Sequence, residues 1–274
     1  MKIYDCFMYF DEDLLLDLRL NILNEYVDKF LIIEAEEDHQ GNKRKLNFNI
    51  NNFRKFKDKI DYVPIEKINI DNSIKLKKNW DIGHIRDQSM RNQIQNYLSN
   101  AQDNDWIIIS DLDEIPNPDK ITEFIPKKKF AFFEQKFFYY KFNVMNETQP
   151  HWYGSRICVK KYLKSPQWLR NIKIKKRNFL KKYLFNLNYQ IIKNGGWHFS
   201  NLKTPAELVK KISSSCHGEF NQPEFKNEKL IREKIEMLED IFERNYIFKK
   251  IEIDDKFPKY LNKNIDKYLN WIKK

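Results

Sequence analysis

The chain has few cysteines, glycines and prolines and no long apolar run, and these shortages exclude several classes of protein. Its 3 cysteines, Cys6, Cys158 and Cys216, are far apart and odd in number, so neither a disulfide framework nor a thiolate zinc site is indicated. No segment approaches the roughly 18 consecutive apolar residues of a membrane span. Acidic residues also interrupt the first apolar segment too early for a signal peptide. A soluble protein of the reducing cytosol fits these absences best.

Composition and charge limit the remaining classes. The 274 residues are 41% hydrophobic and 15% aromatic, which is enough for a sizeable core and excludes disordered and fibrous proteins. Lys and Arg number 50 against 39 Asp and Glu, a net charge of +11 that favours an anionic partner. Lys and Asn are also over-used along the whole chain, and such a bias raises the net charge without a functional demand.

Apolar runs of strand length alternate with segments of helical period through roughly the first half of the chain. This pattern predicts an α/β fold with a mainly parallel sheet flanked by helices. We expect strands at 3–9, 30–33, 62–64 and 106–109, a strand or hairpin at 130–142, and helices at 14–25, 84–101, 205–212, 227–245 and 261–272. The helix at 205–212 has the clearest start, because Thr204 and Glu207 have the spacing of a capping box and Pro205 lies between them.

An acidic string, Ser110-Asp111-Leu112-Asp113-Glu114-Ile115-Pro116, follows the most apolar of these strands. Side chains alternate along a strand, so Asp111 and Asp113 are expected on one side, with Cα atoms roughly 6 to 7 Å apart. At the carboxyl edge of a sheet, such a pair can hold a hard divalent cation that in turn binds a diphosphate. The plainer alternative is that these acids cap a helix that begins near Asp119.

Three further segments carry candidate functional groups. The polar segment 34–45 follows the second strand, where α/β sheets bind ligands. In Gly195-Gly196-Trp197-His198 the glycines allow close backbone approach, and His198 could complete a metal's ligand set from a loop or serve as a structural histidine. In Cys216-His217-Gly218-Glu219 the carboxylate of Glu219 and the imidazole of His217 could act as a general base and its orienting partner.

In this order and in this pattern, these elements resemble glycosyltransferase family 17 of a soluble bacterial or viral type. The family is known for the enzyme that adds bisecting N-acetylglucosamine to glycoproteins. The acidic string alone is shared by many sugar-nucleotide enzymes, but its combination with Gly-Trp-His is more specific. The matching segments are Ile3-Tyr4-Asp5-Cys6-Phe7, Phe30-Leu31-Ile32-Ile33-Glu34 with Gly41, Lys43 and Lys45, Arg91-Asn92, Asp111-Leu112-Asp113-Glu114-Ile115-Pro116, Gly196-Trp197-His198, Thr204-Pro205 with His217-Gly218-Glu219, and Pro258-Lys259-Tyr260-Leu261.

The resemblance implies a GT-A-like fold, a nucleotide-sugar donor such as UDP-N-acetylglucosamine, manganese or magnesium as cofactor, and an inverting single displacement. It implies one domain over 1–274, with a nucleotide-binding half at 1–125 and an acceptor half at 126–274. Asp111 would contact the donor ribose or the metal, Asp113 would bind the metal, and His198 would contact the metal or the diphosphate. The resemblance places Glu34 and Lys45 at the nucleotide end and Arg91 at a phosphate, which a guanidinium can bind through two hydrogen bonds.

Inversion requires a base that deprotonates the acceptor hydroxyl. Glu219 is the first candidate, followed by Glu134 and Glu114. The sequence shows no membrane anchor or luminal stem, so a cytoplasmic enzyme acting on a glycan or a lipid-linked saccharide is expected in preference to one acting on a glycoprotein. The basic runs at 173–177 and 181–182 would then rest on the inner face of an anionic membrane, or form a solvated basic face.

Two other classes of protein share some of these features. A haloacid-dehalogenase-like phosphatase would use Asp111 as a nucleophile, but the acidic string lies too far into the chain and Ile115 replaces the expected Thr or Val. A basic nucleic-acid-binding protein leaves the acidic pair unexplained, since carboxylates repel phosphates unless a metal lies between them. Nucleic acid is therefore not an expected partner.

Overall fold

The computed structural model describes residues 1–70, 81–174 and 189–274. The strands of these residues are β1 (Ile3–Met8), β2 (Lys29–Ala35), β3 (Ile60–Ile65), β4 (Trp106–Ile109), β5 (Glu114–Pro116), β6 (Phe130–Tyr139), β7 (Val144–Asn146), β8 (His151–Trp152), β9 (Arg156–Val159), β10 (Tyr189–Ser200) and β11 (Phe248–Lys250). The α-helices are α1 (Asp13–Leu23), α2 (Asp81–Gln93), α3 (Pro118–Ile121), α4 (Pro166–Asn171), α6 (Pro205–Ser214), α7 (Glu228–Met237) and α8 (Lys259–Lys263). The 3-10 helices are η1 (Ile50–Phe56), η2 (Ile94–Tyr97), η3 (Pro126–Lys128), η4 (Lys160–Tyr162), η5 (Gly218–Phe220), η6 (Pro223–Lys226) and η7 (Ile265–Trp271).

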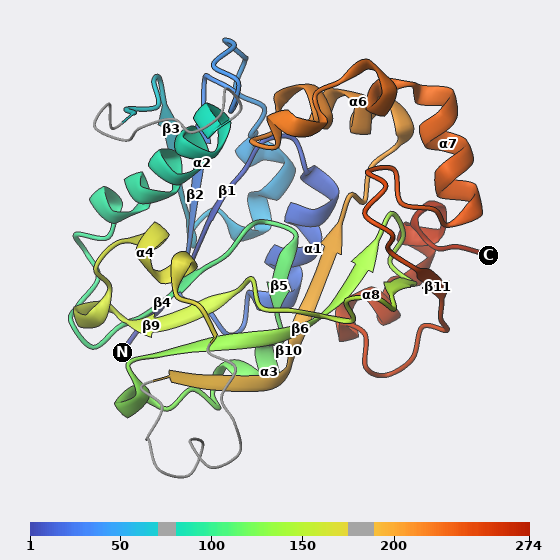
Figure 1. Ribbon diagram of the computed structural model, residues 1–274. Coiled ribbons are helices and arrows are strands. Elements are labelled where there is room, and N and C mark those ends of the chain that lie inside the picture. Colours follow the sequence, from blue (N-terminus) through green and yellow to red (C-terminus); the bar gives the residue numbers. More distant parts are fainter. Residues whose placement is uncertain (71–80, 175–188) are drawn as a thin grey trace, which may run out of the picture.

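These strands form one mixed sheet whose central order is β6-β9-β4-β1-β2-β3 (Figure 1). The neighbours β3, β2, β1 and β4 are all parallel, as expected for the first half of the chain. The expectation of a mainly parallel sheet holds only for these strands. From β9 onward the pairing is antiparallel except between β6 and β10. The α/β class itself is confirmed.

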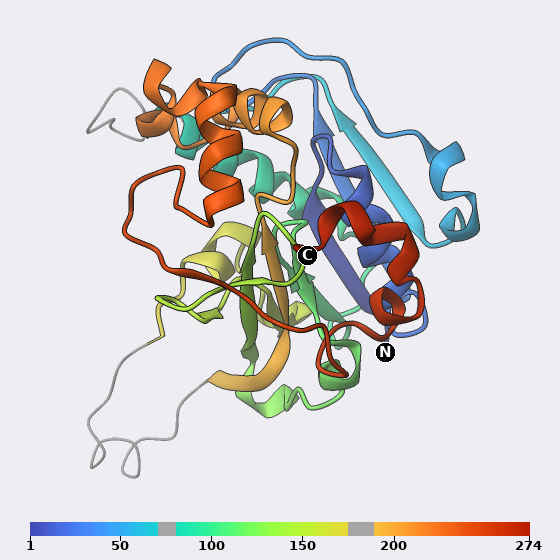
Figure 2. The same ribbon diagram turned by 90° about the vertical axis from the view of Figure 1, so that its right-hand side faces the viewer.

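Both faces of the parallel strands are covered by helices, which explains their continuous apolar sequences. Along β2, Phe30 and Ile32 pack in a cluster with the leucines of α1, whereas Leu31 and Ile33 pack on the other face with apolar residues of α2, η2 and α4. The C-terminal helices α8 and η7 lie on the same side as α1 (Figure 2). Burial on both faces fixes these strands in the middle of the molecule.

A third apolar cluster lies beyond the parallel strands, in the C-terminal half. Phe137 and Tyr139 at the end of β6 pack against Leu208 and Ile212 of α6. Ile231 of α7 and the strand β11 complete this cluster. It places α6 and the segment that follows it above the carboxyl ends of the central strands (Figure 1).

Several expected elements differ from those observed. The helix expected at 84–101 ends at Gln93 and continues as the tighter η2. The helix expected at 227–245 ends near Leu238, which has a left-handed backbone with φ of 58°. The C-terminal helix is divided into α8 and η7. Helical periodicity in the sequence does not distinguish one continuous helix from two short helices that follow each other directly along the chain.

The capping box of α6 is confirmed, and its removal gives a measurable stability change. Thr204 Oγ1 accepts a hydrogen bond from the Glu207 backbone N–H, and Glu207 Oε2 accepts one from the Thr204 N–H. We expect Thr204→Ala to lower the free energy of unfolding by about 1 kcal/mol in urea titrations, because the Glu207 backbone N–H loses its partner. Thr122→Ala, at an exposed threonine, is the matched control and should change it by less than about 0.5 kcal/mol. Equal losses in both variants would contradict a specific capping role.

No helix within the described ranges is long and apolar enough to cross a membrane.

Candidate active site at the carboxyl ends of the parallel strands

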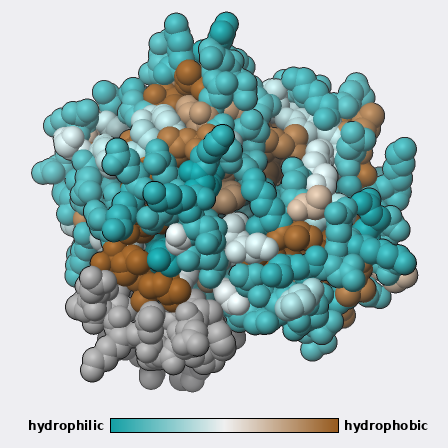
Figure 3. All heavy atoms as spheres, turned by 90° about the horizontal axis from the view of Figure 1, so that it is seen from above, coloured by the Kyte–Doolittle hydropathy of each residue, from teal (hydrophilic) through white to brown (hydrophobic). Residues whose placement is uncertain are grey.

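A cavity of about 420 Å³ lies where β1, β2 and β4 end. Since β1 lies between β2 and β4, the connections leave it in opposite directions, and α/β sheets bind ligands at such a switch point. In a view onto this end of the molecule, apolar side chains are visible between polar ones near the middle of the face (Figure 3). Its wall includes Tyr9, Phe10, Glu37, His39, Asp87, Asp111, Asp113, Glu114, Phe137, Trp152, His198, Ser200, Lys203, Cys216, His217 and Tyr246.

The acidic string forms a tight turn after β4. The Glu114 backbone N–H donates to the Asp111 carbonyl at 3.1 Å, and Leu112 points into the core, 5% exposed. The expectation that strand alternation aligns Asp111 and Asp113 is therefore wrong, because these residues are not in a strand. Both nevertheless line the cavity, with side chains that are 39% and 19% exposed.

A fully buried arginine holds this turn in place. The guanidinium of Arg19, from α1, binds both carboxylate oxygens of Asp5 on β1, at 2.6 and 2.8 Å. The same group donates to the carbonyl oxygens of Asp111, Leu112 and Glu114 at 2.9 to 3.1 Å. One side chain therefore connects β1, α1 and the backbone of the acidic turn.

Asp111 is held by two arginines. Arg91 of α2 donates to its Oδ1 at 2.9 Å, and Arg170 of α4 donates to its Oδ2 at 2.8 Å. Burial alone would raise the pKa of Asp111, but the charges of Arg170 and Arg91 hold it well below its usual value. Arg91 also binds Asp87 through two hydrogen bonds, and Arg170 also binds Glu114. Asp111 is thus an ionised carboxylate in a fixed orientation.

Asp113 faces an imidazole. Its Oδ2 lies 3.5 Å from His198 Nε2, a longer separation than in a strong hydrogen bond. The imidazole stacks on Phe137, with ring centroids 4.6 Å apart and an interplanar angle of 8°, and Trp152 covers it at 4.9 Å. These rings fix the orientation of His198 beside Asp113 in the cavity wall.

His198 belongs to β10 and not to the expected loop. The pairing of β10 with β6 shifts between Ile192 and Gly196, as in a β-bulge. Gly196 has φ of +142°, and a Cβ there would lie 2.1 Å from the Ile115 carbonyl oxygen, so a side chain cannot be accommodated. The glycines thus allow β10 to pass close to β5 and place the following histidine beside the acidic turn.

Three residues expected to contact the nucleotide do not line this cavity. Glu34 is fully buried and accepts hydrogen bonds from Arg44, Tyr62 and the backbone of the segment after Arg44, so it shapes that segment. Lys45 is exposed and lines a neighbouring hollow of about 380 Å³. Arg91 lies behind Asp87 and Asp111, and its Nη atoms are engaged with their carboxylates.

The glutamates considered as the base occupy different positions. Glu219 lies in η5 with Oε1 2.9 Å from His217 Nδ1, and His217 itself lines the cavity while Glu219 does not. Glu134 is bound to Tyr153 and Lys193 away from the cavity wall. Glu114 lines the cavity, but its oxygens accept hydrogen bonds from Arg170, Trp152 and the Asp111 N–H.

Several site residues were missed by the sequence reasoning. Arg170 and Trp152 lie in the region between β6 and β10, where the alternation of apolar residues gave no clear boundaries. Arg19 lies within the apolar stripe of α1, and a charged residue there is itself a signal, since a buried arginine requires a partner. That signal would have indicated Asp5 or another buried acid.

The ligand atoms that each residue can offer decide which residues suit a divalent ion. Both oxygens of Asp111 are engaged by guanidinium groups, whereas Asp113 and His198 present an oxygen and a nitrogen ligand side by side. Carboxylate oxygen and imidazole nitrogen both suit manganese and similar ions. The chemistry therefore fits an ion at Asp113 and His198 better than at Asp111.

The chain is similar to one protein family over almost its whole length. A solved structure described as a glycosyltransferase involved in the glycosylation of the major capsid of PBCV-1 is 15% identical, covering 70% of this chain and 81% of that one, with a TM-score of 0.31. No curated protein matches the chain. The model of glycosyltransferase family 17 matches residues 1–269, almost the whole sequence. The chain therefore belongs to glycosyltransferase family 17 and is a glycosyltransferase.

Proposed function

We propose that this glycosyltransferase transfers a sugar, with inversion, from a UDP-sugar to a glycan hydroxyl, with manganese or magnesium as cofactor. The observation that carries the proposal is the pair Asp113 and His198, 3.5 Å apart in the cavity at the switch point of the sheet. An ion at this position would suit the diphosphate of a nucleotide sugar. The diphosphate leaves with negative charge, which a cation beside it can stabilise. N-acetylglucosamine is the proposed sugar, since it is the one that the family resemblance implies.

Different residues of the chain would bind different parts of the nucleotide-sugar donor. Asp113 and His198 would hold the ion, which when bound neutralises the charge of the leaving diphosphate. Asp111 is fixed by Arg91 and Arg170 but remains 39% exposed, and each of its oxygens has a second lone pair. It can therefore accept a hydrogen bond from the donor ribose while its orientation stays constant.

Lys45 is proposed for the nucleotide end. It lines the neighbouring hollow together with Phe10, Arg44, Asn47 and Lys210. Phe10 and Arg44 also line the main cavity, so the two hollows are adjacent. The side chain of Glu34 would act on the nucleotide only through the segment that it holds.

Aromatic residues beside His198 support an acceptor sugar in this cavity. Phe137, Trp152 and Tyr246 line it, and Phe137 packs against both of the others. Aromatic faces combine a large apolar area with polar edges, which suits the alternating C–H and hydroxyl groups of a sugar ring. A glycan or lipid-linked saccharide is the proposed acceptor. The basic runs that would rest on a membrane lie outside the described residues from position 175 onward.

The earlier alternatives are not supported. Family membership argues against the phosphatase and against a nucleic-acid-binding protein.

Calorimetric titration with nucleoside diphosphates tests the proposal. We expect UDP to bind in the presence of manganese, and more tightly than ADP, GDP or CDP. Excess chelator should abolish this binding, because the ion joins the diphosphate to Asp113 and His198. Equal binding of UDP with and without chelator would contradict the metal, and failure of all four nucleotides to bind with manganese would contradict the donor class.

A further inference from the structure

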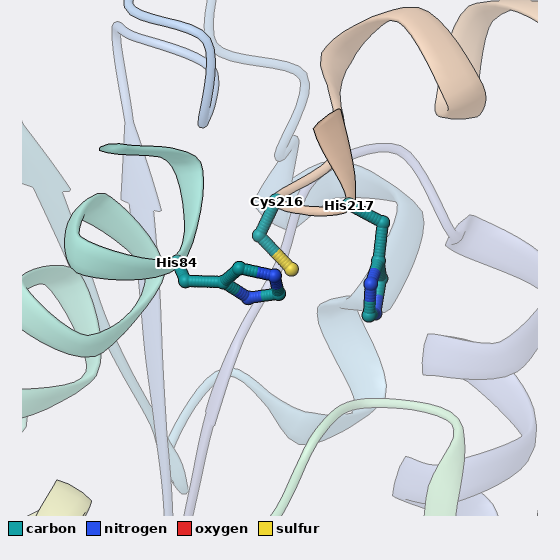
Figure 4. Close-up of side chains that lie close together, drawn as sticks. All are labelled: His84, Cys216 and His217. Atoms are coloured by element: carbon teal, nitrogen blue, oxygen red, sulfur yellow. The ribbon is translucent and has the colours of Figure 1, made fainter. Parts of the chain in front are cut away.

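A second group of metal-binding side chains lies beside the cavity. His84, Cys216 and His217 place their ligand atoms within 4.8 Å of one another. His84 comes from the first turns of α2, and the other two residues follow α6 (Figure 4). The sulfur of Cys216 points into the space between the two imidazoles (Figure 4).

The backbone around this cluster is built for close approach. Gly83 precedes His84, and a Cβ at Gly83 would lie 2.8 Å from the Cys216 carbonyl oxygen, so a larger residue would push the two segments apart. On the other side, the His39 N–H donates to the Ser214 carbonyl at 3.1 Å. The side chain of Gln40 donates to the Ser215 carbonyl at 2.6 Å. The segment after α6 is therefore fixed on two sides, against α2 and against the segment after β2.

A carboxylate lies beside both histidines of the cluster and binds one of them. Glu219 Oε1 lies 2.9 Å from His217 Nδ1, and Glu219 Oε2 lies 3.9 Å from His84 Nε2. Among the described residues, this Oε2 is a buried atom with no hydrogen-bond partner. A carboxylate that binds one nitrogen of an imidazole leaves the second nitrogen of that ring free for a metal. Zinc-binding histidines are usually held by a carboxylate or carbonyl in this way.

We propose that His84, Cys216 and His217 bind zinc, with Glu219 as a positioning residue and the fourth place open to water or ligand. Two imidazoles and one thiolate are a zinc donor set, and a site with three protein ligands keeps an open position. The bound ion would join α2 to the segment after α6 and stiffen one wall of the cavity, since Cys216 and His217 line it. This site is separate from the ion proposed at Asp113 and His198.

The proposal changes two earlier interpretations. The number and spacing of the three cysteines indicate no thiolate zinc site, and His84, which lies beside Cys216 in the structure, is distant from it in sequence. Glu219 is the first candidate for the catalytic base in the sequence, whereas here it orients His217. A second group, His39, Asp87 and Cys216, also has ligand atoms within 4.8 Å, but Arg91 already holds both oxygens of Asp87.

Cobalt titration of the chelator-treated full chain tests this site, because a thiolate bound to cobalt gives a charge-transfer band in the near ultraviolet. We expect the band in the wild-type chain, its loss on zinc addition, and its absence in Cys216→Ser, which retains Cys6 and Cys158. His84→Ala and His217→Ala should weaken cobalt binding by more than about 100-fold, and Glu219→Gln by about 10 to 100-fold with the band retained. Circular dichroism would establish that each variant is folded.

Asp113→Asn is the control that separates the two metal sites, and it should keep the band unchanged. No band in the wild-type chain, or a band that persists in Cys216→Ser, would overturn the zinc site. A band that is lost in His39→Ala but kept in His84→Ala would overturn the proposed ligand set.

Discussion

Replacing Asp113 with asparagine should lower the rate of sugar transfer by more than about 100-fold and leave the protein folded. Loss of a residue that only orients a metal ligand typically costs 10 to 100-fold, so loss of a direct ligand should cost more. Asparagine has nearly the same shape but no charge, and Asp113 lies in a turn that Arg19 holds through backbone carbonyls. Manganese binding, measured by electron paramagnetic resonance, should weaken in parallel with activity.

Two variants serve as controls for this result. Asp255→Asn, at an exposed aspartate outside the cavity wall, should leave activity and manganese binding unchanged. Asp111→Asn should retain manganese affinity within about threefold, because both oxygens of Asp111 are already held by arginines. If Asp111→Asn lost manganese and Asp113→Asn kept it, the assignment of the ligands would be reversed.

Replacing Arg19 with methionine should lower the free energy of unfolding by about 3 to 5 kcal/mol, measured by urea titration. The change leaves the fully buried carboxylate of Asp5 without its counter-charge, and the removal of one partner of a buried pair is costly. It also removes the hydrogen bonds to the carbonyl oxygens of Asp111, Leu112 and Glu114. Activity should fall more than stability alone predicts, since the acidic turn would no longer be fixed.

The double variant Asp5→Asn, Arg19→Met separates these two effects. It removes the uncompensated charge, so part of the stability should return, but the turn still lacks its donor and activity should stay low. Arg232→Met is the matched control, because the pair of Arg232 with Glu228 is exposed and should contribute less than about 1 kcal/mol. Full recovery of activity in the double variant would contradict a positioning role for Arg19.

The strands and the capped helix could be predicted because their signals are local. Trp106–Ile109 is a continuous apolar run with bounds that match the observed strand, and the capping box at Thr204 lies within four consecutive residues. The weak strand expected at 62–64 is longer, because Ile60 and Ile65 are buried although polar residues interrupt the run. Helix ends were less predictable, since no Pro or Gly marks the breaks after Gln93 and near Leu238 in the sequence.

The candidate site was predicted only in part. Asp111, Asp113 and His198 were identified from their order along the chain, and the structure brings all three to one cavity. The reason given for the first two was wrong, because a turn and not strand alternation presents them. Arg170 was missed, since its bonds to Asp111 and Glu114 span 59 and 56 positions and leave no local pattern.

The sequence by itself determined the α/β class, the family and the type of chemistry, because apolar periodicity and short motifs are properties of neighbouring residues. Only the tertiary structure decided which charges meet. It paired Asp111 with two arginines, placed Arg19 under the acidic turn, and brought His84 to Cys216 across 132 positions, which is 216 minus 84. Such pairings depend on how elements distant in sequence pack together, and the energy of a charge depends on the partners that this packing provides.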